Sequence, residues 1–216
     1  DDWMRTYASA EMGITDKVAI IPNGVDTDVF TPAPQTRPVV RVLALARWVQ
    51  KKGLRHLCAA FRALRPAHAE LLIVGYGPEE EQLRAAAGVN TAISFAPPIA
   101  SEALPAAYQA ADLFVAPCVA VKGGDADGVP TTVLEAMACG LPVIASDLHS
   151  MPLYVGHGSC GLLTAPGDEV QLAQALATLI GNGDLRRAMG ANARAQVVTR
   201  FGLRRVLDQL EAVLAH

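Results

Sequence analysis

The chain has 216 residues, of which 51% are hydrophobic and 18% are charged. This composition is typical of a globular domain with a large core and excludes a disordered chain. The formal charge is −3 and only 5% of the residues are aromatic, which disfavours a basic platform for nucleic acid. The apolar runs are far shorter than the roughly 20 residues that cross a bilayer.

Short apolar runs alternate with segments of helical periodicity along the chain. The runs predict strands at 18–21, 39–46, 71–74, 92–95, 113–116, 143–145 and 161–164. The periodic segments predict helices at about 53–65, 79–87, 101–110, 130–139 and 168–181, followed by two more near the end. Several of the runs are apolar nearly throughout, as in parallel strands covered on both faces. We therefore expect an α/β fold with a Rossmann-like, doubly wound parallel sheet.

The domain organisation follows from this alternation. Residues 18–200 are predicted to form one domain and residues 201–216 a C-terminal helix. The chain starts without methionine, so we interpret residues 1–17 as the remnant of a preceding domain or an interdomain linker. The four cysteines form no Cys-x-x-Cys pair and no secretory leader opens the sequence, from which we expect free thiols and a cytoplasmic location.

The first candidate site is the loop after the predicted strand 39–46. Arg47 and Lys52 converge there, at the strand end where open α/β sheets bind ligands. A guanidinium and an ammonium group suit the two phosphates of a diphosphate. The alternative is that both are solvated surface cations, which strand-end loops often carry.

The second candidate is the helix predicted after the strand 113–116. Pro130 suits its first turn and Gly140 suits a left-handed stop. The helix dipole and the amides of Thr131 and Thr132 should then point into the same cleft as the two cations.

Two carboxylates accompany this helix. Asp127 precedes it and Glu135 lies about one turn inside it, so they can contact different parts of one elongated ligand, for example its sugar hydroxyls. The alternative is that Asp127 only offsets the helix dipole and that Glu135 is an exposed helical position.

A set of motifs in a fixed order resembles the donor-binding domain of the family-four (group 1) retaining glycosyltransferases, one half of the GT-B fold. The motifs are Ile21-Pro22-Asn23-Gly24-Val25-Asp26 with Phe30, Arg47 to Gly53, Val74-Gly75-Tyr76-Gly77-Pro78, Ala111-Asp112-Leu113-Phe114-Val115-Ala116-Pro117, Asp127 to Pro142, and Gly161-Leu162-Leu163. Each motif alone is modest, but the ordered set covers nearly the whole chain and is highly specific.

The resemblance implies roles for individual residues. Arg47 and Lys52 would bind the donor diphosphate, Glu135 would contact the nucleotide ribose, and Asp127 would touch the transferred sugar. The backbone near Ile99 would pair with the nucleobase edge. The remaining substrate-binding positions that the resemblance implies are Gly77, Gly128, Val129, Pro130, Thr131 and Thr132.

Two positions depart from the family pattern. Asp127 stands where the family has a glutamate, and Leu153 replaces a glutamate found in many relatives, which leaves the identity of the sugar open. Asp125-Ala126-Asp127 imitates the metal signature of another glycosyltransferase fold, but the surrounding sequence resembles the metal-independent fold, so no cofactor or metal is expected.

The resemblance implies transfer of a sugar from a nucleotide diphosphate donor to a hydroxyl acceptor with retention of configuration. The Asp127 to Pro130 variant resembles bacterial enzymes of exopolysaccharide or lipopolysaccharide synthesis, which work at the inner face of the membrane. A glycan or lipid-linked acceptor would bind the absent N-terminal domain, so the isolated chain should transfer little. Peripheral membrane association of the full-length protein is compatible with this, and nucleic acid is not expected as a partner. The alternatives are a nucleotide-sugar 2-epimerase of the same fold and a non-catalytic nucleotide-binding module.

Overall fold

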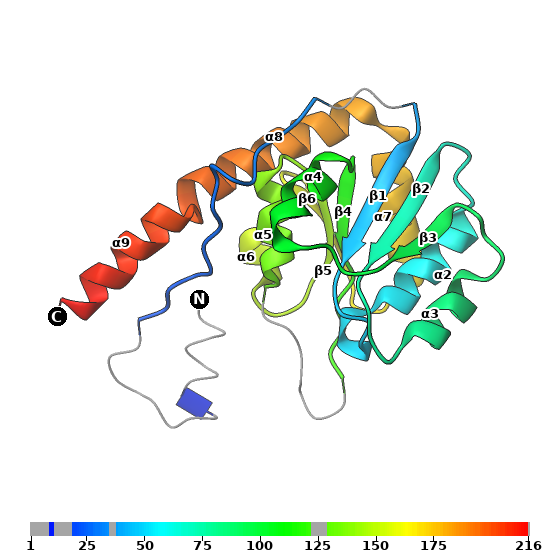
Figure 1. Ribbon diagram of the computed structural model, residues 1–216, viewed down its shortest axis with the longest axis horizontal. Helices are drawn as coiled ribbons and strands as arrows, with labels where there is room; N and C mark the ends of the chain where they lie inside the picture. The colour runs from blue at the N-terminus through cyan, green and yellow to red at the C-terminus, as the bar shows by residue number, and fades with distance from the viewer. Residues whose placement is uncertain (1–8, 11–18, 35–37, 122–128, 216) are drawn as a thin grey trace.

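Six parallel strands form one sheet in the order β3-β2-β1-β4-β5-β6 in the computed structural model (Figure 1). The structure describes residues 9–10, 19–34, 38–121 and 129–215. The strands are β1 (Val40–Leu45), β2 (Ala69–Val74), β3 (Ile93–Ala96), β4 (Leu113–Ala116), β5 (Val143–Ser146) and β6 (Gly161–Thr164). The helices are α2 (Leu54–Leu64), α3 (Glu80–Ala87), α4 (Leu104–Gln109), α5 (Thr131–Ala138), α6 (Met151–Tyr154), α7 (Glu169–Gly181), α8 (Gly183–Arg200) and α9 (Leu203–Leu214), with short 3-10 turns at Gln50–Lys52 and Ser101–Ala103.

The sheet is covered on both faces, which confirms the predicted doubly wound α/β fold. Alternate residues of β1 enter different apolar clusters: Val42 packs with α2, α3 and α7, whereas Leu43 packs with α4, α5 and α8. Every residue of β4 and β5 is buried. Strands enclosed on both faces must be apolar nearly throughout, and this is the pattern that the sequence carries.

The strand order reverses direction between β1 and β4, since the chain winds outward from β1 to β3 and then returns to place β4 on the other side of β1. Crossover connections therefore run to opposite sides at this point. The loops after neighbouring strands diverge there, which opens a crevice at the carboxyl ends of the strands. This topology fixes where a ligand site has to be sought.

The predicted strand at 18–21 is wrong for the described residues 19–21, which are not in a strand. Further along the chain, Val25 forms a single parallel bridge with Gly202, between α8 and α9. Pro22 lacks the amide that a ladder requires, and Gly24 lies against Leu203, since a Cβ there would be 3.2 Å from the Leu203 Cα atom. An apolar run beside a proline therefore predicts a strand, whereas the described residues 19–21 lie outside the sheet.

Helix α8 lies directly on the end of α5. A Cβ at Gly190 of α8 would stand 2.1 Å from the carbonyl oxygen of Gly140, so only glycine permits this approach. Gly140 itself has a φ of 75°, the left-handed conformation that its position after α5 predicted. Helix α9 then continues beyond the sheet (Figure 1). Within the described residues, no helix combines the length and apolarity of a membrane span.

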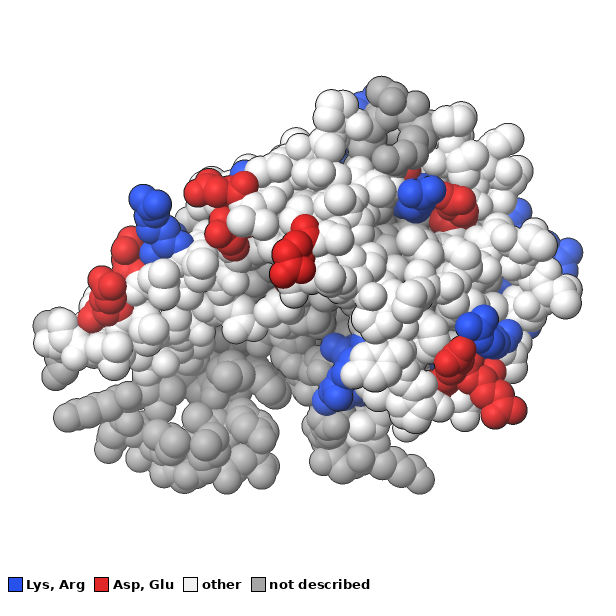
Figure 2. All heavy atoms as spheres, in the orientation of Figure 1, with Lys and Arg blue, Asp and Glu red and all other residues white. Residues whose placement is uncertain are grey.

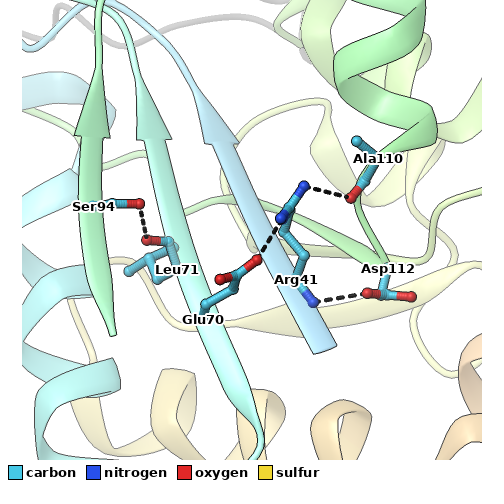
Figure 3. A network of polar contacts seen from close by, with 6 residues as sticks. All are labelled: Arg41, Glu70, Leu71, Ser94, Ala110 and Asp112. Carbon is cyan, nitrogen blue, oxygen red and sulfur yellow. Dashed lines mark hydrogen bonds and ion pairs between the residues drawn. The ribbon is translucent and has the colours of Figure 1, made fainter. Parts of the chain in front are cut away.

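A polar network connects the strands near their amino ends, at the opposite end of the strands from the crevice (Figure 3). Arg41, near the start of β1, donates from Nε to Glu70 of β2 at 2.6 Å and from its backbone N to the Asp112 carboxylate at 2.7 Å. Asp112 is 6% exposed and precedes β4. Three neighbouring strands are thus held in register from their amino ends, which leaves the carboxyl ends to the site.

Candidate functional site

A cleft of ≈ 350 Å³ lies at the carboxyl ends of β1 and β2 and beside the first residues of α5. Its volume is in the range of small-molecule sites. Figure 2 shows Lys and Arg side chains beside a hollow at this end of the molecule. The cleft brings together several residues that the sequence singled out: Arg47, Lys52, Ile99, Pro130, Thr131 and Thr132.

The basic side of the cleft is the loop after β1. Arg47 is exposed and Lys52 is half-buried in the cleft wall. The loop is fixed from behind, because the backbone N of Val119 donates to the carbonyl of Lys51 at 2.9 Å. Gly53 makes this packing feasible: its φ is 63°, and a Cβ there would be 1.9 Å from the Pro117 carbonyl oxygen. The loop that carries the two cations is therefore held against the segment that follows β4.

The opposite side of the cleft is the amino terminus of α5. Thr131 and Thr132 line the cleft, and Pro130, the N-cap residue, makes no side-chain hydrogen bond to the helix. The first amides and the positive end of the helix dipole are groups that attract an anion. Among the described residues that line the cleft, the only ionisable side chains are those of Arg47, Lys52 and Tyr76, and the first two give it a positive field.

Glu135 lies one turn further along α5, on the same side as Thr131 and Thr132, because residues three and four apart share a helix face. It does not line the cleft wall, and it is half-buried rather than exposed. Its Oε2 atom accepts a hydrogen bond of 2.7 Å from the Tyr108 hydroxyl. Burial raises the pKa of the Glu135 carboxyl above its ordinary value, and the hydrogen bond from Tyr108 opposes that rise.

Apolar groups form the remaining wall. Ile99 and Pro98, which follow β3, line the cleft together with Leu104 of α4. Tyr76 lines it from the loop after β2 and is 64% exposed. An apolar surface next to a positively charged one suits a nucleoside and its phosphates.

Gly77 and Val129 lie outside the cleft wall. Gly77 packs against the backbone of Trp48, because a Cβ would be 2.3 Å from the Trp48 carbonyl oxygen. Val129 packs on the apolar cluster around α5. Gly77 therefore shapes the loop that carries Tyr76, and Val129 fixes the approach to Pro130.

Asp127 and Gly128 lie outside the described residues, as do Asp125 and Ala126. The expected contact of Asp127 with a sugar, and the metal-like spacing with Asp125, therefore stay predictions. In the part of the chain that the structure describes, no group of three or more His, Cys, Asp or Glu side chains is arranged to hold a metal ion.

Tyr108 is a residue beside the site to which the sequence assigned no role. It is fully buried on α4, 27 positions before Glu135. An apolar helical pattern gives no sign that the hydroxyl of Tyr108 meets a carboxylate. Leu104 and Tyr76 also line the cleft. No role was predicted for their side chains, because their position depends on how distant segments pack together.

Comparisons with known proteins agree with the fold. The family model described as "Glycosyl transferases group 1" matches residues 39–182, from the start of the sheet to the end of α7. Among solved structures, sucrose-phosphate synthase from Thermosynechococcus elongatus superposes with a TM-score of 0.87 at 25% sequence identity, over 99% of this chain and 56% of that chain.

Two curated relatives are similar at the sequence level. The GDP-mannose-dependent alpha-(1-6)-phosphatidylinositol monomannoside mannosyltransferase of Mycobacterium tuberculosis is 34% identical over 92% of this chain and 56% of that protein. The amylovoran biosynthesis glycosyltransferase AmsK of Erwinia amylovora is 34% identical over 81% of this chain and 44% of that protein. The chain thus spans about half the length of the relatives it matches. These matches confirm the family resemblance predicted by the ordered motifs.

Proposed function

The chain belongs to the glycosyl transferases group 1 family, and from this premise we propose that it is the donor-binding part of a retaining glycosyltransferase. The protein would transfer a sugar from a nucleotide diphosphate sugar to a hydroxyl acceptor. One observation carries the proposal: Arg47, Lys52 and the start of α5 at Thr131 line the same cleft.

The electrostatics of the cleft suit this reaction. Cleavage of the glycosidic bond of the donor loads negative charge onto the departing diphosphate. Two cations and the amides of a helix terminus, fixed before the reaction begins, stabilise that charge more in the transition state than in the ground state. Because these groups supply the positive charge, we propose that transfer needs no divalent metal.

The nucleoside would lie against the apolar wall, with its base near Ile99 and its ribose near Glu135. Backbone contacts to the base leave the nucleotide open, so GDP is the first probe, since the mycobacterial relative is named as GDP-mannose-dependent. UDP is the second. The name of the Erwinia relative refers to amylovoran biosynthesis, which supports a role in bacterial exopolysaccharide or lipopolysaccharide synthesis. We place this work in the cytoplasm, at the inner face of the membrane.

Binding of GDP and UDP to the chain by calorimetry tests the diphosphate pocket. Lys52→Ala and Arg47→Ala should each weaken binding by about 10- to 100-fold, the value of a hydrogen bond between charged groups. Arg55→Ala removes an exposed cation from α2, outside the cleft, and serves as the control. Equal affinity in Lys52→Ala and wild type would refute the pocket.

Turnover in the full-length protein tests the reaction. Lys52→Ala should lose most sugar transfer while its thermal unfolding stays unchanged. Product analysis with a nucleotide sugar should yield a glycoside of retained configuration. An epimerised donor, or no change of the donor, would instead identify an epimerase or a binding module.

A further inference from the structure

Tyr108 of α4 is fully buried, and its hydroxyl contacts a carboxylate. Its ring packs between aromatic neighbours, with centroid distances of 5.9 Å to Phe30 and 5.7 Å to Phe114. Its hydroxyl donates to Glu135 Oε2 at 2.7 Å. A tyrosine enclosed by rings has few orientations, so its hydroxyl is a fixed point within the core.

Glu135 meets this fixed point with one of its two carboxylate oxygens. Among the described residues, no hydrogen bond is made to its Oε1 atom, and the side chain is half-buried on the face of α5 that also presents Thr131 and Thr132. A carboxylate accepts through both oxygens. One oxygen is therefore engaged inside the protein while the other is left for a group outside it.

We propose that Tyr108 is a positioning residue, which holds the Glu135 carboxylate so that its second oxygen accepts a hydrogen bond from a ribose hydroxyl of the donor nucleotide. The inference rests on the proposed function, because the ribose reaches Glu135 only when the diphosphate occupies the cleft. Tyr108 acts through Glu135 and does not touch the nucleotide.

Two physical effects support this role. Without the phenol, the carboxylate would be free to change rotamer, and the geometry offered to a ligand would be lost. Donation by Tyr108 also favours the charged carboxylate, whose pKa burial would otherwise raise further. Burial and the charge of Glu135 in turn raise the pKa of Tyr108 well above its ordinary value, so the phenol stays protonated and donates at neutral pH.

The test compares GDP with inorganic pyrophosphate, which occupies the phosphate site but has no ribose. Calorimetry of the chain should show that Tyr108→Phe weakens GDP binding about 10-fold and leaves pyrophosphate binding unchanged. Tyr154→Phe is the matched control. It removes a hydroxyl from a half-buried tyrosine that stacks on Phe201, away from the cleft, and should change neither affinity.

A double-mutant cycle separates positioning from general stability. If Tyr108 acts only through Glu135, Tyr108→Phe should have no further effect on GDP affinity in a Glu135→Ala background. An equal loss in both backgrounds, or an equal loss for GDP and pyrophosphate, would overturn the inference. Glu135→Ala alone must reproduce the GDP-specific loss even if Tyr108→Phe fails to fold, and an unchanged affinity there would also overturn it.

Failure of the diphosphate pocket and failure of the role of Tyr108 give different results. If the wild type binds neither GDP nor pyrophosphate, the proposed function fails and the inference with it. If the wild type binds both and Tyr108→Phe binds them equally well, the diphosphate pocket stands and only the role of Tyr108 is refuted.

Discussion

Arg194 of α8 donates from Nη1 to the carbonyl oxygen of Ala138, the last residue of α5, at 2.8 Å. The same guanidinium also donates to the carbonyls of Phe30 at 2.7 Å and Thr27 at 2.9 Å. Carbonyls at a helix end lack intrahelical partners, and here one side chain satisfies three backbone groups from two segments. The helix that presents Thr131 to the cleft is therefore anchored at its far end.

Arg194→Ala should lower the free energy of unfolding by about 2–4 kcal/mol, since charged hydrogen bonds are lost and half-buried carbonyls are left unpaired. Urea unfolding followed by circular dichroism measures this. Arg194→Lys should retain part of the stability, because an ammonium cannot reach three carbonyls at once. Arg204→Ala, an exposed cation of α9, is the control, and a loss no larger than in this variant would contradict the anchoring role.

Glu135 should reduce the stability of the unliganded protein at neutral pH. Burial raises its pKa in the folded state, so the folded protein binds its proton more tightly than the unfolded chain. Stability from this group is present below the unfolded pKa and is lost as pH rises through the folded pKa. Glu135→Gln, which keeps an acceptor for Tyr108, should therefore unfold at a higher temperature than wild type at pH 7.

The pH dependence checks the cause. The difference in Tm between Glu135→Gln and wild type should shrink as the pH falls toward the ordinary pKa of a glutamate, because both proteins are then uncharged at this position. Glu80→Gln supplies the comparison, since Glu80 is an exposed residue paired with Arg84. A Tm difference for Glu135→Gln that is independent of pH would show that its carboxylate is not penalised by burial.

Most of the sheet could be predicted because parallel strands enclosed on both faces leave an unmistakable apolar pattern, as in β4 and β5. Residues 18–21 form a similar apolar run, but the described residues 19–21 are not in a strand. A short apolar run joins a sheet only where a partner strand is available and its backbone can complete the ladder, and Pro22, directly after this run, has no amide to donate. Local pattern carries no information about the partner strand.

The cleft could be predicted in outline because topology places strand-end loops together. Arg47, Lys52 and Thr131 followed from this rule. The link between Tyr108 and Glu135 could not be found this way, because it depends on the packing of α4 against α5 rather than on the sheet. The spacing of residues in the sequence does not indicate which side chains of two packed helices contact each other.

Gly77 allows the loops after β1 and β2 to pack closely and to form hydrogen bonds between their backbones. Trp48 donates its backbone N to the Tyr76 carbonyl at 2.7 Å and accepts from Glu79 N at 3.1 Å. A Cβ at Gly77 would stand 2.3 Å from the Trp48 carbonyl oxygen, closer than any van der Waals contact permits. Gly77→Ala should lower the free energy of unfolding by about 1–3 kcal/mol, as overpacking does, and displace the neighbouring Arg47.

Thermal unfolding and GDP calorimetry together measure both consequences of Gly77→Ala. We expect GDP to bind more weakly because the guanidinium of Arg47 is displaced, even at temperatures where the variant is fully folded. Gly181→Ala is the matched control, because a Cβ at the end of α7 meets nothing within 4 Å and alanine favours a helix by up to about 1 kcal/mol. If Gly77→Ala matched Gly181→Ala in stability and in GDP affinity, the contact between the loops after β1 and β2 would not be needed to position Arg47.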